Sequence, residues 1–253
     1  MLSGVAKKTK TPRPPVQAPK RRDTKSSPGG GVLANIPRSA VVAGVVALVA
    51  VIAIVVIAVS SGGSGGGSSA VEDAMAAAGC QLKQVDPLPP KNAKSAQPNY
   101  HADVPTLTTP TKGLWSTFPP SAGGHFGAWA VWGFFRAPVN PRQVVHNEEH
   151  GGVIIWWGPN VPQSTVDQLE AFYRESPNSM FGTPIAGLGD KIALTAWTGD
   201  PTKYYRDGNY GTGHIATCTK FDEKAFKAFR DAYRGKGPEG IPASSNTPGS
   251  GPS

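Results

Sequence analysis

Apolar and polar positions divide the chain into a membrane-like segment and one folded domain. Residues 40–59 are all Ala, Val, Ile or Leu apart from Gly44. From residue 71 to 236, short apolar runs alternate with stretches in which apolar residues recur every three or four positions. Residues 61–70 and 237–253 are mostly Gly, Ser and Pro, which is typical of linkers and tails without a core.

The long apolar segment predicts a transmembrane helix over 39–60. At about 1.5 Å per residue a helix of this length is roughly 30 Å long, which matches a bilayer's hydrocarbon core. A cleavable signal peptide is the alternative, because Ala58-Val59-Ser60 has the small residues of a cleavage site.

Four apolar runs bounded by glycine predict strands over 127–135, 152–157, 192–197 and 214–219. Strands with helices between and after them indicate an α+β domain over 71–236, with a mixed or antiparallel sheet and two to three helices.

Three segments have helical patterns. An Ala-rich helix is expected over 71–78. A second begins at Ser164, where Ser164 and Asp167 resemble a capping box. Asp222 is placed to cap a third, which stops at Gly235.

Residues 84–120 contain eight prolines and few apolar positions. Because proline cannot donate to a sheet ladder, we expect an extended segment that wraps over the domain. Loops of this length are commonly functional, which makes His101 a candidate site residue.

The positive charge lies almost entirely before the apolar segment. Residues 1–38 hold nine of the 25 Lys and Arg and one acid, which accounts for the whole net charge of +8. The rest is therefore neutral, which argues against nucleic-acid binding. We interpret 1–38 as a disordered, basic, Pro-rich cytoplasmic tail that contacts the lipid bilayer. The positive-inside rule then places the domain outside the cell membrane.

Cys80 and Cys218 are the two cysteines of the chain. On the oxidising side of a membrane they predict a disulfide. A thiolate redox or copper site is the alternative, although no Cys-x-x-Cys spacing marks one.

The densest group of potential metal ligands is His146-Asn147-Glu148-Glu149-His150. The two histidines share one side of a helix or one face of a strand. A helix would bring Glu149 nearer the two rings, whereas a strand would bring Glu148 between them. Two imidazoles and a carboxylate suit zinc or copper(II), and His125 or His101 would supply a third nitrogen. The alternative is a polar cluster that packs a turn.

A catalytic interpretation of this segment also exists. His-x-x-Glu-His is the inverzincin pattern, in which Glu149 would activate water as the catalytic residue of a zinc hydrolase. Gly151-Gly152 and the β-branched run after them would end the helix early. No P-loop, dinucleotide fingerprint or serine elbow is present, so the pattern favours binding over enzymatic activity.

Six tryptophans suggest a function of another class. Trp156 and Trp157 are adjacent, so their rings point to opposite faces of a strand. If the outward rings are exposed, they would form a patch for an envelope glycan or an envelope protein.

Several segments together resemble a known family. The loop, the histidine segment, the strand and the C-terminal residues concerned are Pro119-Pro120-Ser121-Ala122-Gly123-Gly124-His125, His146-Asn147-Glu148-Glu149-His150-Gly151-Gly152-Val153, Leu194-Thr195-Ala196-Trp197, and Phe229, Tyr233, Pro238 and Glu239. Over roughly residues 100–239 the chain resembles the bacterial family catalogued as domain of unknown function 3105. Its members look like single-pass or secreted proteins.

The resemblance implies that His125, His146, Glu149 and His150 belong together, because all four fall on motif positions. It implies no particular reaction. This chain departs from the pattern at Glu148, where an apolar residue is common, and in the loop before His125. An acid at position 148 argues against an incidental, buried role for that side chain.

Overall fold

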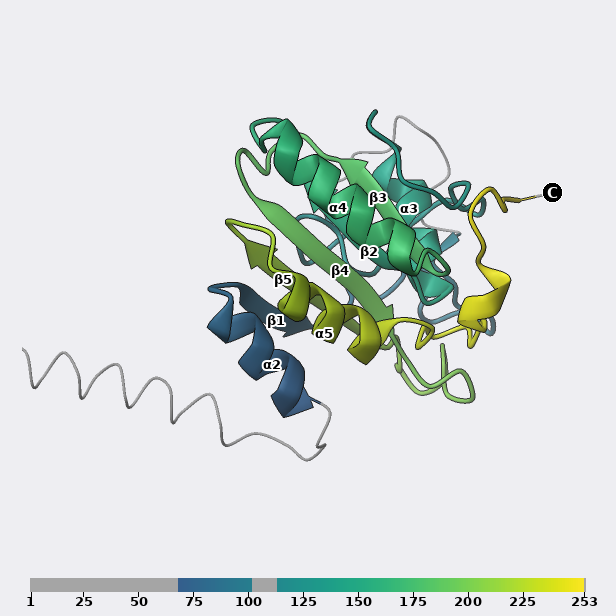
Figure 1. Ribbon diagram of the computed structural model, residues 1–253. Coiled ribbons are helices and arrows are strands. Elements are labelled where there is room, and N and C mark those ends of the chain that lie inside the picture. The colour runs from purple at the N-terminus through teal and green to yellow at the C-terminus, as the bar shows by residue number, and fades with distance from the viewer. Residues whose placement is uncertain (1–67, 102–112, 253) are drawn as a thin grey trace, which may run out of the picture. The chain divides into compact units, whose positions relative to one another are not determined.

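The computed structural model describes residues 68–101 and 113–252 (Figure 1). The expected cytoplasmic tail, the transmembrane segment over 39–60 and most of the linker lie outside the described residues. Within the described ranges, no helix combines the length and the apolar character needed to cross a bilayer.

The domain is α+β and is built on one mixed sheet of five strands in the order β1-β5-β4-β2-β3, which confirms the predicted class. The described residues form four α-helices where two to three were expected, because the segment of His146 and Glu149 is also helical. Neighbouring strands are antiparallel except for β2 and β3, which are parallel and are connected through α4. The strands are β1 (Gln81–Val85), β2 (Val153–Trp157), β3 (Met180–Pro184), β4 (Ile192–Thr198) and β5 (Thr212–Cys218). The helices are α2 (Ser68–Ala77), α3 (Pro141–Glu149), α4 (Gln163–Glu175) and α5 (Glu223–Tyr233), followed by the 3-10 turn η2 (Ala243–Ser245).

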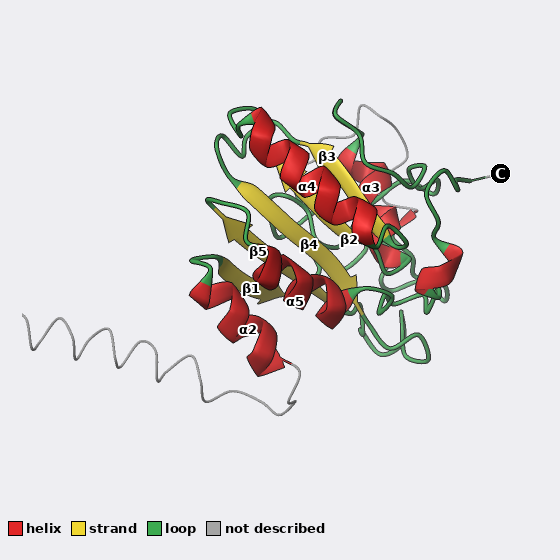
Figure 2. Ribbon diagram, viewed as in Figure 1, coloured by secondary structure: helices red, strands yellow, loops and turns green. Residues whose placement is uncertain are grey.

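Helices cover both faces of the sheet, and each face has its own core. In Figure 2, α2, α4 and α5 lie over one face, and α3 lies behind the sheet. Val153, Ile155 and Trp157 of β2 belong to the core under α4 and α5. Ile154 and Trp156 pack instead with Val144 of α3. Burial on both faces explains the uninterrupted apolar run of this strand.

The predicted disulfide is confirmed. Cys80 precedes β1 and Cys218 ends β5, with a Cα–Cα distance of 4.4 Å. The bridge therefore holds the edge strand β1 against β5, at the register where Gln81 pairs with Thr217.

The structure contains two strands that the pattern did not predict. Strand β1 has the mostly polar sequence QLKQV at the sheet edge, so no apolar run marks it. Strand β3 contains Gly182 and ends at Pro184, two residues that ordinarily weaken a strand. Gly182 is required here, because a Cβ at this position would lie 2.2 Å from the Phe134 ring.

The predicted strand over 127–135 is wrong. This segment forms only an isolated bridge between Phe134 and Gly182. Its backbone groups are satisfied elsewhere: Ala130 donates to and accepts from the Asn147 side chain, at 2.9 Å each. Ala130 and Trp132 are buried with Val144 of α3 and with β2.

Helix starts were predicted correctly for α5 and incorrectly for α4. The Asp222 side chain accepts from the Ala225 N–H at 3.0 Å and caps α5. Helix α4 begins at Gln163 after Pro162, and no side-chain hydrogen bond caps it. Asp167 instead accepts from Gln163 Nε2 at 3.0 Å, so the capping-box interpretation of Ser164 was wrong.

The exposed rings that a tryptophan patch requires are not present at Trp156 and Trp157. Trp156 is 0 % exposed and Trp157 is 5 % exposed, because both sheet faces are covered. Trp132 and Trp197 are buried as well. These rings stabilise the core and are not available to stack on a glycan.

The proline-rich segment and the C-terminal segment were both expected to lack regular structure, and only the first does so as predicted. Residues 86–101 and 113–120 run largely without regular structure over the domain, as the prolines predict. Residues 237–252, by contrast, pack on the domain where a disordered tail was expected. Asn246 is 4 % exposed, and its amide donates to His150 O at 2.9 Å and to Ser179 Oγ at 2.8 Å.

Candidate metal centre

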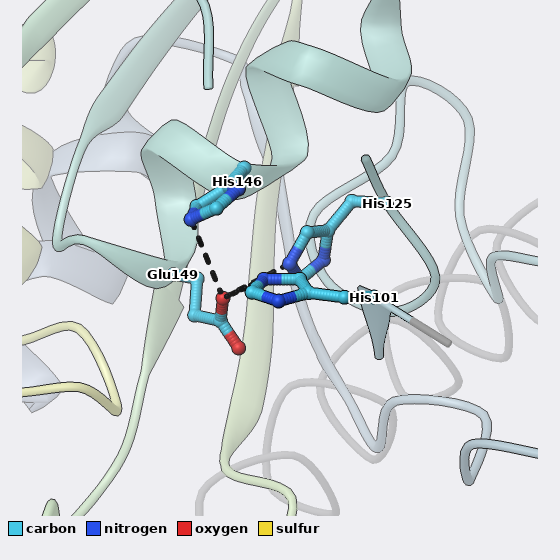
Figure 3. A group of neighbouring side chains, drawn as sticks. All are labelled: His101, His125, His146 and Glu149. Atoms are coloured by element: carbon cyan, nitrogen blue, oxygen red, sulfur yellow. Dashed lines mark ion pairs between the residues drawn. The ribbon is translucent and has the colours of Figure 1, made fainter. Parts of the chain in front are cut away.

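Four side chains from three segments of the chain meet in one cluster, and one of these segments is the extended stretch that contains His101. His101, His125, His146 and Glu149 each offer one ligand atom, and these atoms all lie within 4.8 Å of one another. We call these four residues the His/Glu cluster. Figure 3 shows the three rings directed at one carboxylate oxygen, Glu149 Oε2. This oxygen lies 2.9 Å from His125 Nε2, 3.5 Å from His101 Nε2 and 4.0 Å from His146 Nε2.

Helix α3 places two of the four residues. It starts with Pro141 after Asn140, whose side chain accepts from Arg142 N at 3.0 Å, and it ends at Glu149. Gly151 follows with φ +84°, where a Cβ would be strained. The helical alternative is therefore confirmed for this segment, and with it the expectation that Glu149, not Glu148, lies near the rings.

Backbone carbonyls orient two of the imidazoles. His125 Nδ1 lies 2.7 Å from Gly123 O, and His146 Nδ1 lies 2.7 Å from Phe126 O. Each ring therefore donates from Nδ1 and presents the lone pair of Nε2 to the cluster. This tautomer is the one that a metal-binding histidine commonly adopts when an outer partner fixes its other nitrogen.

The two oxygens of Glu149 have separate partners. Oε1 accepts from Tyr204 OH at 2.5 Å and from Tyr205 OH at 3.1 Å. Oε2 faces the histidines and forms ion pairs with His125 Nε2 and His101 Nε2. Burial opposes ionisation of Glu149, yet His125 and the hydrogen bonds from His101 and Tyr204 hold its pKa well below the ordinary value. The cluster thus contains a buried carboxylate.

The imidazoles differ in their electrostatic surroundings. Burial, and then the neighbouring His125, lowers the pKa of His146 to about 3, so its ring is neutral. His101 is 40 % exposed at the edge of the cluster. A hydrogen bond to Glu149 raises the pKa of His101.

His150 lies beside the cluster and has a different carboxylate partner. Its Nε2 is 3.0 Å from His146 Nε2, one helical turn earlier, and 3.0 Å from Glu239 Oε2. Glu239 comes from the segment after α5. All five predicted site residues are therefore neighbours, but His150 pairs with Glu239 and not with Glu149.

Sequence reasoning missed the functional candidates Tyr204, Tyr205 and Glu239 as ligand-shell residues. The two tyrosines lie between β4 and β5, and Tyr205 has a left-handed φ of 61°. A non-glycine residue in this region is a strained backbone position that points to function. The signals available in the sequence were the adjacent Tyr-Tyr pair and the place of Glu239 among the C-terminal residues that resemble the family.

Glu148 points away from the cluster into the core. It is 0 % exposed, accepts a hydrogen bond from Thr195 Oγ1, and leaves its Oε2 without a partner among the described residues. Burial raises the pKa of Glu148 well above the ordinary value. The expectation that an acid at this position would not be buried is wrong: the side chain is inward-facing, as an apolar residue would be.

Replacing Glu148 with Leu should raise the free energy of unfolding. The change removes a buried carboxyl with an unpaired oxygen, and Leu has a similar volume. Thr195 loses its acceptor but still accepts from Trp156 Nε1 at 2.7 Å. We expect a net gain of about 1–2 kcal/mol in urea unfolding. A loss of stability in Glu148→Leu would show that the acid contributes to the core.

The fifth histidine, His214, predicts a pH dependence of stability away from the cluster. It is 5 % exposed, stacks on Tyr233 and lies 2.8 Å from Thr198 Oγ1 through Nε2. Burial, and then Lys236, lowers the pKa of His214 to about 4. Between pH 6.5 and 4 the unfolded chain binds a proton at this ring that the folded chain does not, so stability falls as the pH falls.

At pH 5 this effect should cost the parent roughly 2 kcal/mol relative to pH 7.5. His214→Gln lacks the titrating ring, while all other titrating groups are shared. Urea unfolding of both proteins at the two pH values should therefore give a difference of this size. Parallel pH profiles for the parent and His214→Gln would contradict the assignment.

Comparisons with known proteins show a family but no characterised relative. Residues 110–245 match the family described as "Protein of unknown function (DUF3105)". No curated protein and no solved structure matches the chain. The match includes His125, His146, Glu149, His150 and Glu239, and it covers more than half of the chain. The resemblance seen in the sequence is confirmed, and the chain belongs to the DUF3105 family.

Proposed function

We propose that this domain binds a divalent transition metal ion through His101, His125, His146 and Glu149. The observation that carries the proposal is the convergence of three imidazole nitrogens on Glu149 Oε2, with all four ligand atoms within 4.8 Å of one another. His125 Nε2 and Glu149 Oε2 are buried and form an ion pair at 2.9 Å. A divalent cation would replace the proton that they share, because a neutral imidazole nitrogen and a carboxylate oxygen are both ligands of such ions.

The donor set favours zinc or copper(II). Three imidazole nitrogens and one carboxylate oxygen are borderline ligands of the kind that these ions select over Mg²⁺ or Ca²⁺. With bonds of about 2.0–2.1 Å, the ligand atoms of a tetrahedral site lie about 3.3 Å apart. The distances of 2.9, 3.5 and 4.0 Å around Glu149 Oε2 bracket this value.

Glu149 suits a metal ligand better than the general base of a zinc hydrolase. Its Oε2 is directed to the same point as the three rings, and its Oε1 is held by two tyrosine hydroxyls. Helix α3 also ends at Glu149, whereas the inverzincin pattern lies within a long helix. These features support binding, and Glu149→Gln would test the alternative by keeping metal while losing turnover.

The proposed location is the outer side of the cell membrane. The apolar segment over 39–60 and the basic tail before it support a single-pass anchor with the N-terminus in the cytoplasm. The disulfide between Cys80 and Cys218 is consistent with an oxidising compartment.

Elemental mass spectrometry tests the proposal directly. The full-length chain, carrying an affinity tag without histidine, is stripped with a chelator, exposed to Zn²⁺ or Cu²⁺ and freed of unbound metal. We expect at least one ion per chain in the parent, at least one ion fewer in His146→Ala/His150→Ala, and parent-like binding in the control His214→Gln. A folded parent that binds neither ion would overturn the proposal.

A further inference from the structure

With His150 and Glu239, which lie beside the His/Glu cluster, six side chains at this place can donate to a metal ion. Glu149 Oε2 is close to His125 and His101, while His150 Nε2 is close to both His146 and Glu239. We infer that the site holds two transition-metal ions, one on His101, His125 and Glu149 and a second on His146, His150 and Glu239. This inference rests on the proposed function and extends it to a two-metal centre.

Distances within each set support the division. In the first set, His125 and His101 lie 2.9 and 3.5 Å from Glu149 Oε2. In the second, His150 Nε2 lies 3.0 Å from His146 Nε2 and 3.0 Å from Glu239 Oε2. All four values are near the separation of about 3.3 Å expected between ligands of one ion. The contact between the sets, His146 Nε2 to Glu149 Oε2, is longer, at 4.0 Å.

His146 determines how the two sets share their ligands. Its Nδ1 is occupied by the Phe126 carbonyl, so only Nε2 is available and the ring cannot bridge two ions. With a single ion bound, His146 completes the first set as its fourth ligand. When a second ion is present, the shorter distance to His150 assigns His146 to the second set.

Each set then has two histidines and one carboxylate, which leaves coordination positions open. Three protein ligands with an open position are typical of metal sites that bind water or a substrate. The nearest ligand atoms of the two sets, His146 Nε2 and Glu149 Oε2, are 4.0 Å apart, so two bound ions would be near neighbours, as in two-metal sites, whose ions lie about 3.5–4 Å apart. A pair of ions at this distance can hold an oxygen ligand, such as a water or an anionic oxygen, between them.

Solvent can reach the proposed pair of ions from one side. His101 is 40 % exposed in the first set, and the Glu239 side chain is 33 % exposed in the second. Both residues lie at the edge of the site, and Glu239 contributes to raising the pKa of His101. The buried ligands His125, His146 and Glu149 form the floor.

Metal stoichiometry separates this inference from the proposed function. We expect two Zn²⁺ per full-length chain in the parent and in His214→Gln, and one in His150→Ala/Glu239→Gln. Because Glu239 is partly exposed and His150 lies at the end of α3, this variant is designed to keep the fold, which circular dichroism checks. A parent that binds one ion overturns the two-metal inference and leaves the proposed function standing. A parent that binds none overturns both.

Copper(II) loading locates the second ion. Two Cu²⁺ ions about 4 Å apart should give a spin-coupled electron paramagnetic resonance spectrum in the parent, and His150→Ala/Glu239→Gln should give the spectrum of an isolated ion. A parent with two bound copper ions and no coupling would place the second ion elsewhere on the surface and overturn the inference.

Discussion

His125→Gln will lower the affinity of the full-length protein for Zn²⁺ by at least about 100-fold. His125 is 0 % exposed, and its Nε2 makes the shortest contact with Glu149 Oε2. Removing a partner outside the ligand shell already costs about 10–100-fold in other metal sites, so losing a ligand should reach at least the upper end of that range. An amide oxygen is a poor replacement, because transition metals prefer imidazole.

Competition against a chromophoric chelator measures this affinity. The matched control is His214→Gln, which makes the same substitution at the one histidine of the chain outside the cluster and its His150 neighbour. We expect the control to bind Zn²⁺ as the parent does. Equal losses in the two variants would point to a general effect on folding, and an unchanged affinity in His125→Gln would remove His125 from the site.

The part of the site that lies on one helix was predictable, and the part assembled by tertiary packing was not. A spacing of four residues places His146 and His150 one turn apart whatever surrounds them. The position of Glu149 near the two rings then depended only on the segment being a helix and not a strand. By contrast, Tyr204 bonds to Glu149 from 55 residues further along the chain, and Glu239 pairs with His150 from a segment after α5. The local sequence pattern does not predict contacts between residues so far apart.

The fold shows the same division between local pattern and context. Strands β2 and β4 are buried on both faces; β2 is marked by a continuous apolar run, and β4 by a run that only Thr195 interrupts. The run over 127–135 has a similar composition, but its backbone bonds to the Asn147 side chain and to Ser250 O instead of joining a ladder. Apolar composition therefore predicted burial only for Ala130 and Trp132, while Val131 is exposed, and it predicted the hydrogen-bond partner incorrectly.

Glu148 shows how a single position can mislead. The family resemblance placed an apolar residue there, and the acid in this chain suggested a role outside the core. The helix instead directs Glu149 to the histidines and Glu148 toward Thr195 in the interior. Adjacent positions on a helix face directions about 100° apart, so two neighbouring acids have opposite environments, one ionised beside imidazoles and one with a raised pKa.

The Cys80→Ala/Cys218→Ala variant should lose roughly 4–5 kcal/mol in its free energy of unfolding. The disulfide closes a loop with a sequence separation of 138 residues, and in the loop-entropy model a cross-link of this length destabilises the unfolded chain by about that amount. Alanine is the appropriate replacement, because both cysteines are buried in the core with α2 and α5.

Urea unfolding of the oxidised parent, the reduced parent and the variant measures this effect. The reduced parent and the variant should agree, because both lack the cross-link. Zinc affinity should change little in the folded variant, since the bridge belongs to the core under α2 and α5, whereas the cluster is built from α3 and the segments around it, including the wrap. A loss of less than 1 kcal/mol would mean that β1 and α2 stay docked without the bridge. A parallel loss of zinc affinity in the folded variant would instead show that the bridge helps to position the site, through β5 and β4 or through β1 and the segment after it, which carries His101.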